Sequence, residues 1–358
     1  MLDAIGQQLL FSFDPETAHG LSLTALRCGV PLGAPAKPDP RLEVTVAGID
    51  LPNPLGMAAG YDKNAEVPDA LLGLGFGFAE VGTLTPKPQS GNPKPRIFRL
   101  PLDQAVINRL GFNNEGHDAA ARRLEARLGR AGVVGVNIGA NKDSSDRATD
   151  YVEGVRRFSR LGTYLTANIS SPNTPGLRDM QARAALAELL ERMLEARAGL
   201  PADQQKPIFL KIAPDLTEGD LDDIADEVMG QGLDGVIVSN TTISRPILRS
   251  RTHGGENGGL SGRPLFSRAT ATLAKMRKRL GTDMPIVGVG GVDSTEAALE
   301  KIRAGADLVQ LYTGMIYAGP KMPGRIVSGM SEVLDRTGSK SIRALRDTRL
   351  DHWAAQPL

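Results

Sequence analysis

The sequence predicts an α/β protein built as a (β/α)8 barrel, with a small helical extension at its N-terminus. Eight short β-rich runs follow one another along the 358 residues, and most are continuously apolar, which is typical of strands buried on both faces of a parallel sheet. Helical stretches lie between them. Glycine is also abundant, with 41 residues, which suits many tight strand-to-helix turns. These three observations together define the fold class.

The repeated units give the order of the barrel. The predicted strands are residues 55–59, 78–82, 133–138, 164–169, 208–212, 235–238, 286–289 and 308–312. The clearest helices between them are 182–198, 221–229, 267–279 and 295–304. Hydroxyl side chains at Thr217 and Ser294 are typical helix N-caps. Eight β–α units predict a closed barrel. A doubly wound sheet is the main alternative, but it would not need eight regular repeats.

Two segments precede the barrel. Residues 41–52 alternate apolar and polar about a turn, which predicts a β-hairpin flooring the barrel. In residues 1–30, Leu2, Ile5, Leu9 and Leu10 share one helical face, and Asp14 caps a second helix that begins at Pro15. This pair is either an ordinary cover packed on the barrel or an apolar platform lying in a membrane surface. We expect residues 1–40 to form the extension and its linker, 41–340 the barrel and 341–358 a tail.

Composition excludes several classes of function. The 42 basic and 41 acidic residues nearly cancel, so no overall field favours nucleic acid. The single cysteine, Cys28, excludes internal disulfides, cysteine-ligated zinc and iron–sulfur clusters. The sequence contains no apolar run of membrane-spanning length and no secretory or transit signal. We therefore expect a cytoplasmic protein with no metal site.

Polar residues cluster where the predicted strands end, and barrel active sites lie at that end. Prolines 172 and 175 stiffen the loop that carries Asn168, Ser171, Asn173 and Thr174. A rigid loop of this kind presents side chains to a ligand, although a polar turn stiffened by proline is the simpler alternative. Hydrolysis by a triad is unsupported, because histidine is nearly absent at strand ends and no paired carboxylates occur there.

Two lysines and two glycine-rich turns indicate an anionic ligand. Lys63 follows the first strand, and Lys211 closes the fifth, where burial requires a negative partner unless the lysine is simply solvated. The glycines at 288–291 and 314 follow strands seven and eight, the usual phosphate cradle of this fold. A flexible glycine-rich loop is also predicted at 258–262.

Six asparagines suit a planar ring with alternating C=O and N–H groups, because an amide both donates and accepts. They are Asn108, Asn113, Asn137, Asn168, Asn173 and Asn240. The cluster at 108–114 has a simpler alternative, a turn leading a helix with Asn113 or Asn114 as N-cap. Lysines beside a flat ligand with a phosphate tail favour flavin redox chemistry.

Four long motifs carry a specific resemblance: residues 59–63 (Ala-Gly-Tyr-Asp-Lys), 108–113 (Asn-Arg-Leu-Gly-Phe-Asn), 168–173 (Asn-Ile-Ser-Ser-Pro-Asn) and 260–265 (Leu-Ser-Gly-Arg-Pro-Leu). From Asp14 to Pro320 the chain resembles the dihydroorotate dehydrogenase family, in particular its class 2, quinone-linked, membrane-associated branch. Other FMN barrels, such as dihydrouridine synthases or old-yellow-enzyme relatives, lack these loops. A flavin barrel acting as a non-enzymatic scaffold is a further alternative.

The resemblance implies oxidation of (S)-dihydroorotate to orotate through FMN, with a membrane quinone as electron acceptor, in de novo pyrimidine biosynthesis. It also implies a monomer that attaches through residues 1–30 to the cytoplasmic face of the bacterial inner membrane as a peripheral protein. Because Arg27 is the only lysine or arginine in that segment, attachment would be hydrophobic rather than electrostatic.

The resemblance also assigns the site residues. Those expected to bind FMN are Ala59, Gly60, Tyr61, Asp62, Lys63, Thr83, Asn137, Asn168, Lys211, Ser239, Gly262, Gly291, Tyr312 and Thr313. Those expected to bind substrate are Lys63, Asn108, Arg109, Leu110, Gly111, Phe112, Asn168, Asn173, Asn240 and Thr241.

The implied catalytic base is Ser171, at the position where class 1 enzymes carry cysteine and class 2 enzymes serine. It takes the C5 proton of the substrate while the C6 hydride passes to flavin N5, and Thr174, Phe112 and a water form a hypothetical proton path. Ser239, where many relatives carry threonine, and Tyr61, where relatives commonly carry an aliphatic residue, depart from the family pattern.

Overall fold

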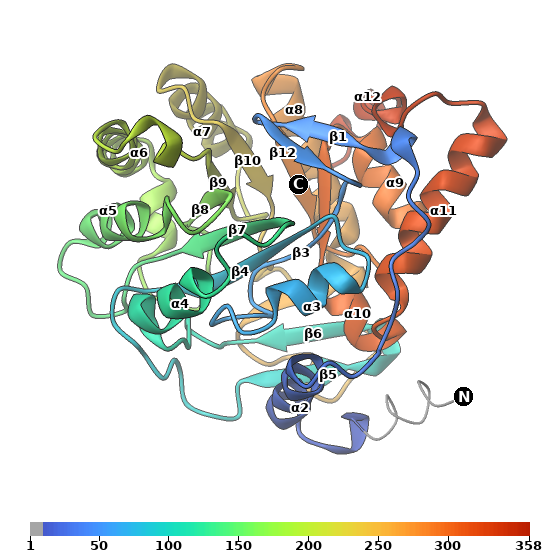
Figure 1. Ribbon diagram of the computed structural model, residues 1–358, viewed down its shortest axis with the longest axis horizontal. Helices are drawn as coiled ribbons and strands as arrows, with labels where there is room; N and C mark the ends of the chain where they lie inside the picture. Colours follow the sequence, from blue (N-terminus) through green and yellow to red (C-terminus); the bar gives the residue numbers. More distant parts are fainter. Residues whose placement is uncertain (1–9) are drawn as a thin grey trace.

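The computed structural model describes residues 10–358, whose centre is a closed barrel of eight parallel strands (Figure 1). In order around the barrel these are β3 (Leu55–Met57), β4 (Phe78–Leu84), β7 (Val133–Ile138), β8 (Tyr164–Asn168), β9 (Ile208–Ile212), β10 (Gly235–Val238), β12 (Ile286–Val289) and β13 (Leu308–Leu311). All eight predicted strands are present. The doubly wound alternative is wrong, because the last strand pairs with the first, Leu311 lying beside Met57.

Helices surround the barrel and shield its apolar strands from water. They are α3 (Pro68–Gly73), α4 (Gly116–Glu125), α5 (Arg147–Phe158), α6 (Arg183–Ala198), α7 (Glu218–Gly230), α8 (Phe266–Leu280), α9 (Thr295–Arg303), α10 (Thr313–Ala318), α11 (Met322–Thr337) and α12 (Leu350–Ala354). The four helices predicted most clearly are α6 to α9. Thr217 and Asp220 form a capping box at α7, and the Ser294 hydroxyl accepts from Ala297 N at 3.1 Å.

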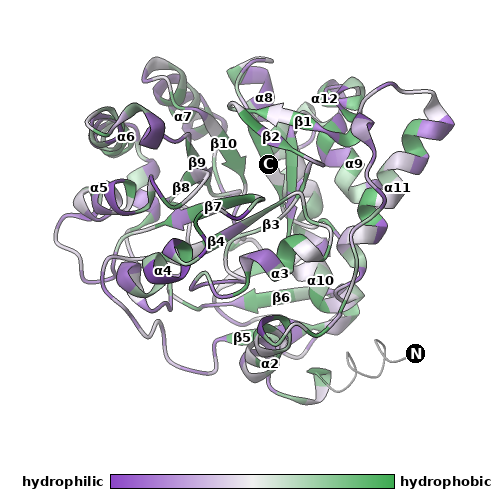
Figure 2. Cartoon of the chain, in the orientation of Figure 1, coloured by the Kyte–Doolittle hydropathy of each residue, from purple (hydrophilic) through white to green (hydrophobic). Residues whose placement is uncertain are grey.

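The distribution of hydrophobic residues explains why the helices pack around the barrel strands. In Figure 2 the barrel strands β7 and β10 are strongly hydrophobic, whereas the outer helices mix the two colours, as expected for helices with one buried face. Within residues 10–358, no helix combines the length and apolar character needed to cross a bilayer.

A hairpin closes the amino-terminal end of the barrel. Strands β1 (Val44–Val46) and β2 (Ile49–Leu51) pair antiparallel, as predicted for residues 41–52. Val46 and Leu51 belong to the same buried cluster as Phe78 and Phe209, whose strands form the barrel wall. The carboxyl ends of the strands therefore form the end of the barrel at which a site can be built.

An additional three-stranded sheet lies over the opposite end. It contains β5 (Ile97–Leu100), β6 (Ala105–Asn108) and β11 (Gly259–Gly262), in the order β11–β6–β5. This sheet was not predicted from the sequence, and the prediction of a flexible loop at 258–262 is wrong for Gly259–Gly262, which form β11. Leu260 pairs with Ile107, and a Cβ at Gly259 would lie 1.9 Å from Thr241 Oγ1, so glycine permits a close approach here.

The segment that follows β6 is not a turn capping a helix at Asn113 or Asn114. Helix α4 begins at Gly116 with Glu115 at the N-cap, and no side chain makes the capping hydrogen bond. The Asn114 Oδ1 instead accepts from the backbone N–H groups of Thr85, at 3.2 Å, and Gly116, at 2.8 Å, and so holds two loops together.

The N-terminal extension contains α2 (Pro15–Arg27), capped as predicted by the Asp14 carboxylate, which accepts from Glu16 N and Thr17 N. The helix lies against β5 and α3 (Figure 1). Most of the first predicted helix, including Leu2, Ile5 and Leu9, falls outside the described residues.

Candidate active site

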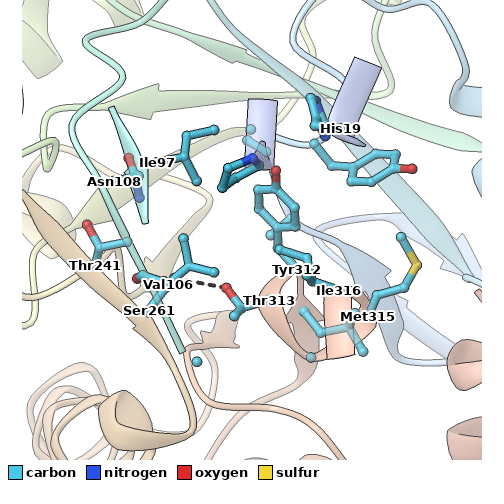
Figure 3. A pocket seen from close by; sticks show the side chains of 18 of the residues that line it. His19, Ile97, Val106, Asn108, Thr241, Ser261, Tyr312, Thr313, Met315 and Ile316 are labelled. Atoms are coloured by element: carbon cyan, nitrogen blue, oxygen red, sulfur yellow. Dashed lines mark hydrogen bonds between the residues drawn. The ribbon is translucent and has the colours of Figure 1, made fainter. Parts of the chain in front are cut away.

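A cavity of about 780 Å³ opens where the barrel strands end. Its walls come from three parts of the molecule: the loops after the strands, the β5–β6–β11 sheet and helix α2. Figure 3 shows Asn108 and Val106 of the sheet on one side and Tyr312 and Thr313 on another, with His19 of α2 above. Thr313 Oγ1 donates to Ser261 Oγ at 2.9 Å and so joins the last strand-end turn to the sheet (Figure 3).

Most of the predicted site residues line this one cavity. They are Ala59, Gly60, Tyr61, Lys63, Thr83, Asn108, Leu110, Gly111, Phe112, Asn168, Ser171, Asn173, Lys211, Ser239, Asn240, Thr241, Gly262, Gly291, Tyr312 and Thr313. They come from loops far apart in sequence, and the barrel brings them together.

Two predicted binding residues lie outside the cavity wall in loops that they stabilise. The Asp62 carboxylate accepts from Glu66 N and Val67 N, both at 2.8 Å, and thereby orders the loop after β3. The Arg109 guanidinium pairs with Glu256 at 2.7 Å and lies 4.6 Å from the ring centre of Phe98. A third predicted residue, Asn137, is fully buried and does not line the cavity.

The turns after β12 and β13 supply a backbone surface that suits a phosphate. Gly290 and Gly291 have φ angles of 107° and 76°, and a Cβ at Gly291 would lie 2.5 Å from Phe266 Cβ. A Cβ at Gly314, in the first turn of α10, would lie 2.4 Å from the carbonyl oxygen of Val292. Side chains are therefore excluded here, and backbone groups form the cavity wall.

Lys211 is buried at the end of β9, so the solvated alternative for this side chain is wrong. Its ammonium donates no hydrogen bond to any residue in the described part of the chain. Burial lowers the pKa of Lys211, and the nearby charge of Glu80 acts in the opposite direction. A buried cation that lines a cavity in this way fits an anionic or strongly dipolar ligand.

Lys63 lies between α2 and the cavity. Its ammonium lies 3.3 Å from His19 Nε2. Burial lowers the pKa of Lys63 to about 8 although the charges of Glu16 and Asp62 favour its protonated form. Burial, followed by the charge of Lys63, lowers the pKa of His19 to about 3. His19 is therefore neutral near pH 7 and accepts the hydrogen bond that Lys63 donates.

The loop after β8 carries Ser171, which is buried at the cavity wall. Its Oγ accepts from Asn173 N at 3.2 Å. The Arg178 guanidinium donates to the carbonyl oxygens of Ser170 and Thr241, both at 3.0 Å, and so fixes this loop against the loop after β10. Thr174 is also buried, and within the described residues its Oγ1 has no hydrogen-bond partner.

The loop after β6 holds an aromatic ring in a strained conformation. Phe112 has a φ of 54°, unusual for a bulky side chain. Its carbonyl oxygen accepts from Asn114 Nδ2 at 2.8 Å and from Gln89 Nε2 at 3.1 Å. Asn173 Nδ2 donates to Asn108 Oδ1 at 3.3 Å, which joins this loop to the Ser171 loop.

Two features of the site were not predicted from the sequence. Glu80 is a fully buried acid at the centre of the barrel. A single charged residue in the middle of an apolar strand was the available signal, the same one used for Lys211. On the α2 side, Tyr61 and Ser22 share a hydrogen bond of 3.0 Å between their hydroxyls.

The closed barrel, with a cavity at the carboxyl ends of its strands and Lys63 and Lys211 in the cavity wall, has the architecture of a (β/α)8-barrel enzyme. A family model described as "Dihydroorotate dehydrogenase" matches residues 41–334. The chain belongs to the dihydroorotate dehydrogenase family.

Relatives agree over the whole length. A protein of Mesorhizobium japonicum named dihydroorotate dehydrogenase (quinone) is 70% identical over 358 residues, covering 100% of this chain and 99% of the relative. One of Brucella ovis with the same name is 62% identical over 360 residues, with the same coverage. The ligand-free crystal structure of the Eimeria tenella enzyme matches with a TM-score of 0.90 at 43% identity, covering 95% of this chain and 99% of that one.

Proposed function

We propose that this chain oxidises (S)-dihydroorotate to orotate in de novo pyrimidine biosynthesis, with FMN as its cofactor and a membrane quinone as electron acceptor. Relatives at 62–70% identity carry the name dihydroorotate dehydrogenase (quinone), and the family is flavin-dependent. The observation that carries the proposal is the meeting of Ser171, Lys63 and Lys211 in one cavity.

The cavity suits FMN in the chemistry of its walls. The glycines at 290, 291 and 314 would hold the phosphate through backbone N–H groups. Lys211, Asn168 and Thr83 would hold the ring, together with the other predicted residues of the cavity wall, Ala59, Gly60, Tyr61, Lys63, Ser239, Gly262, Tyr312 and Thr313. The predicted residues Asp62 and Asn137 would support them from outside the wall. When bound, FMN supplies a hydride acceptor at N5 and returns the electrons to quinone.

The chain's own groups would orient the substrate and take its proton. Asn108 and Asn173, already hydrogen-bonded to each other, would bind the planar ring together with Asn240 and Thr241. Lys63 would pair with the negative charge of the substrate. Ser171 would accept the C5 proton, which the neighbouring carbonyl acidifies, while the C6 hydride leaves. Thr174 Oγ1, buried and unpartnered within the described residues, lies three positions further along and would pass the proton outward.

Lys211 would act by charge. Because its ammonium donates no hydrogen bond in the described part of the chain, it would be available to the ring of bound FMN. A cation there stabilises the extra negative charge of reduction.

The N-terminal extension would bring the quinone to the flavin. Helix α2 forms part of the cavity wall, while Phe13 and Leu21 are exposed large apolar residues of the extension. We assign residues 1–40 to this unit, 41–340 to the barrel and 341–358 to the tail. The protein would act as a monomer, bound peripherally to the cytoplasmic face of the inner membrane through residues 1–30.

An anaerobic absorbance titration tests the function. Dihydroorotate should bleach the flavin, and a quinone, but not fumarate, should restore its colour. A yellow protein that dihydroorotate does not bleach would instead support the scaffold alternative.

A further inference from the structure

The most unusual group in the barrel interior is the carboxylate of Glu80 on β4. It is fully buried and accepts three hydrogen bonds: from Asn137 Nδ2 at 2.7 Å on one oxygen, and from the Tyr164 hydroxyl at 3.0 Å and Gln310 Nε2 at 2.9 Å on the other. Its hydrogen-bond partners among the described residues are all neutral donors. All three neighbouring groups donate, so both carboxyl oxygens of Glu80 act as acceptors.

Because the Glu80 oxygen that faces Asn137 accepts a hydrogen bond, it fixes the orientation of the Asn137 amide. Asn137 must direct its Nδ2 toward Glu80, so its Oδ1 faces the other way. That oxygen accepts from Thr83 Oγ1 at 2.6 Å and from Asn168 Nδ2 at 3.2 Å. Without the acid, either orientation of the Asn137 amide could be satisfied.

The orientation of the Asn137 amide in turn fixes that of Asn168, a residue of the cavity wall. Asn168 Nδ2 also donates to Thr83 Oγ1 at 2.9 Å, so its Oδ1 faces Ser170 and Asn240. Ser170 Oγ donates to that oxygen at 2.9 Å and accepts from Asn240 Nδ2 at 3.0 Å. Asn168 and Asn240 both line the cavity, and Glu80 does not. A chain of hydrogen bonds with one direction therefore connects the buried acid to the ligand-facing amides.

We infer that Glu80 is a positioning residue that sets the donor and acceptor pattern of the cavity by fixing the amide orientations of Asn137, Asn168 and Asn240. The inference rests on the proposed function, because it requires a ring ligand that these amides recognise. Glu80 touches neither substrate nor cofactor in this assignment. It orients the amides through Asn137, and its charge also acts on the buried Lys211, a charge that the double variant keeps in place at position 137.

The test exchanges the acceptor between positions 80 and 137 in the flavin-loaded enzyme. Glu80→Gln removes the obligatory acceptor, and Asn137→Asp places two carboxylates side by side. The double variant restores a satisfied hydrogen bond between the two positions, because the new amide at position 80 can donate to the new carboxylate at position 137. The oxygens of that carboxylate then accept from Thr83 and Asn168 as before. The measurements are the orotate dissociation constant, from its perturbation of the flavin absorbance, and the retention of FMN on dialysis.

Each single variant should weaken orotate binding roughly 10- to 100-fold, the effect of a mispaired buried polar group. The double variant should return close to the parent value. Asp307→Asn is the control, since it removes an acid paired with Arg277 at 2.5 Å outside the cavity. It should lower the melting temperature without changing orotate affinity.

Two results would overturn the assignment: parent-like orotate binding by Glu80→Gln, or a double variant no better than the weaker single one, which would mean that Glu80 only packs. If Glu80→Gln alone is insoluble, a soluble yellow double variant supports the assignment and an insoluble one refutes it. If the parent itself fails to bind orotate, the proposed function fails instead.

Discussion

The Lys63 ammonium lies 3.3 Å from His19 Nε2 and connects the catalytic barrel to the N-terminal helix α2. Neutral His19 accepts this hydrogen bond, and the pKa of Lys63 lies at about 8, so the charge of Lys63 changes within the range in which enzymes are assayed.

Orotate binding should therefore weaken as the pH rises. Below pH 8 Lys63 is protonated and attracts the anionic ligand, whereas above pH 8 it is neutral. We expect the orotate dissociation constant to be flat up to about pH 8 and then to rise up to tenfold per pH unit. Flavin absorbance titrations from about pH 6.5 to about pH 9 span the change in charge and measure this. The Lys63→Met variant should bind orotate weakly, and its dissociation constant should not rise with pH. A dissociation constant of the parent protein that stays flat over this pH range would contradict the proposed role of Lys63.

Ser171→Ala should slow flavin reduction by dihydroorotate roughly 10²–10⁴-fold, because a positioned base is lost. FMN and orotate should still bind, since the Ser171 Oγ accepts only from Asn173 N among the described groups. Anaerobic stopped-flow absorbance gives the rate. Ser171→Cys should keep part of it with a shifted pH profile. A near-normal rate in the alanine variant would remove Ser171 from the mechanism.

Lys211→Met should weaken FMN retention at least tenfold, because a charge-assisted hydrogen bond contributes about 1.5–3 kcal/mol. The flavin midpoint potential should also fall, since the reduced anion loses its compensating cation. Dialysis and a redox titration provide the two values. Lys278→Met, at a half-exposed lysine, is the matched control. An unchanged potential in the Lys211 variant would argue against this role.

Gly291→Ala should release FMN. The left-handed φ of 76° costs a non-glycine residue about 1–2 kcal/mol, and the new Cβ would lie 2.5 Å from Phe266 Cβ. Gly281→Ala is the control, because it has a similar φ of 72° but nothing within 4 Å of its Cβ. Both variants should lose stability, and only the first should lose flavin. Equal flavin retention would mean that the turn does not hold the phosphate.

Replacing Phe13 and Leu21 together with serine should abolish flotation with liposomes and reduce turnover with long-chain quinone. Reduction of the flavin by dihydroorotate should persist. Leu128→Ser removes an equally exposed leucine, 49% exposed compared with 43% for Leu21, and should change neither. High salt should release little parent protein, because Arg27 is the only lysine or arginine in residues 10–30. Retained flotation in the double variant would contradict hydrophobic attachment.

The barrel was predictable because its strands are buried on both faces and therefore continuously apolar, as in β9 (Ile208–Ile212). The β5–β6–β11 sheet was not, because β11 (Gly259–Gly262) has two glycines and gains its conformation from pairing with β6. Sequence motifs indicated which loops meet at the cavity. They could not indicate that Asn137 faces Glu80, because that contact exists only across the closed barrel.

The β1–β2 hairpin closes the amino-terminal end of the barrel. With Val46 and Leu51 packed into its base, whatever reacts inside must enter and leave by the rim at the carboxyl ends of the strands. Incoming and outgoing molecules therefore share one entrance and must replace one another there. The order in which molecules come and go is then governed by the loops and the helix at the rim.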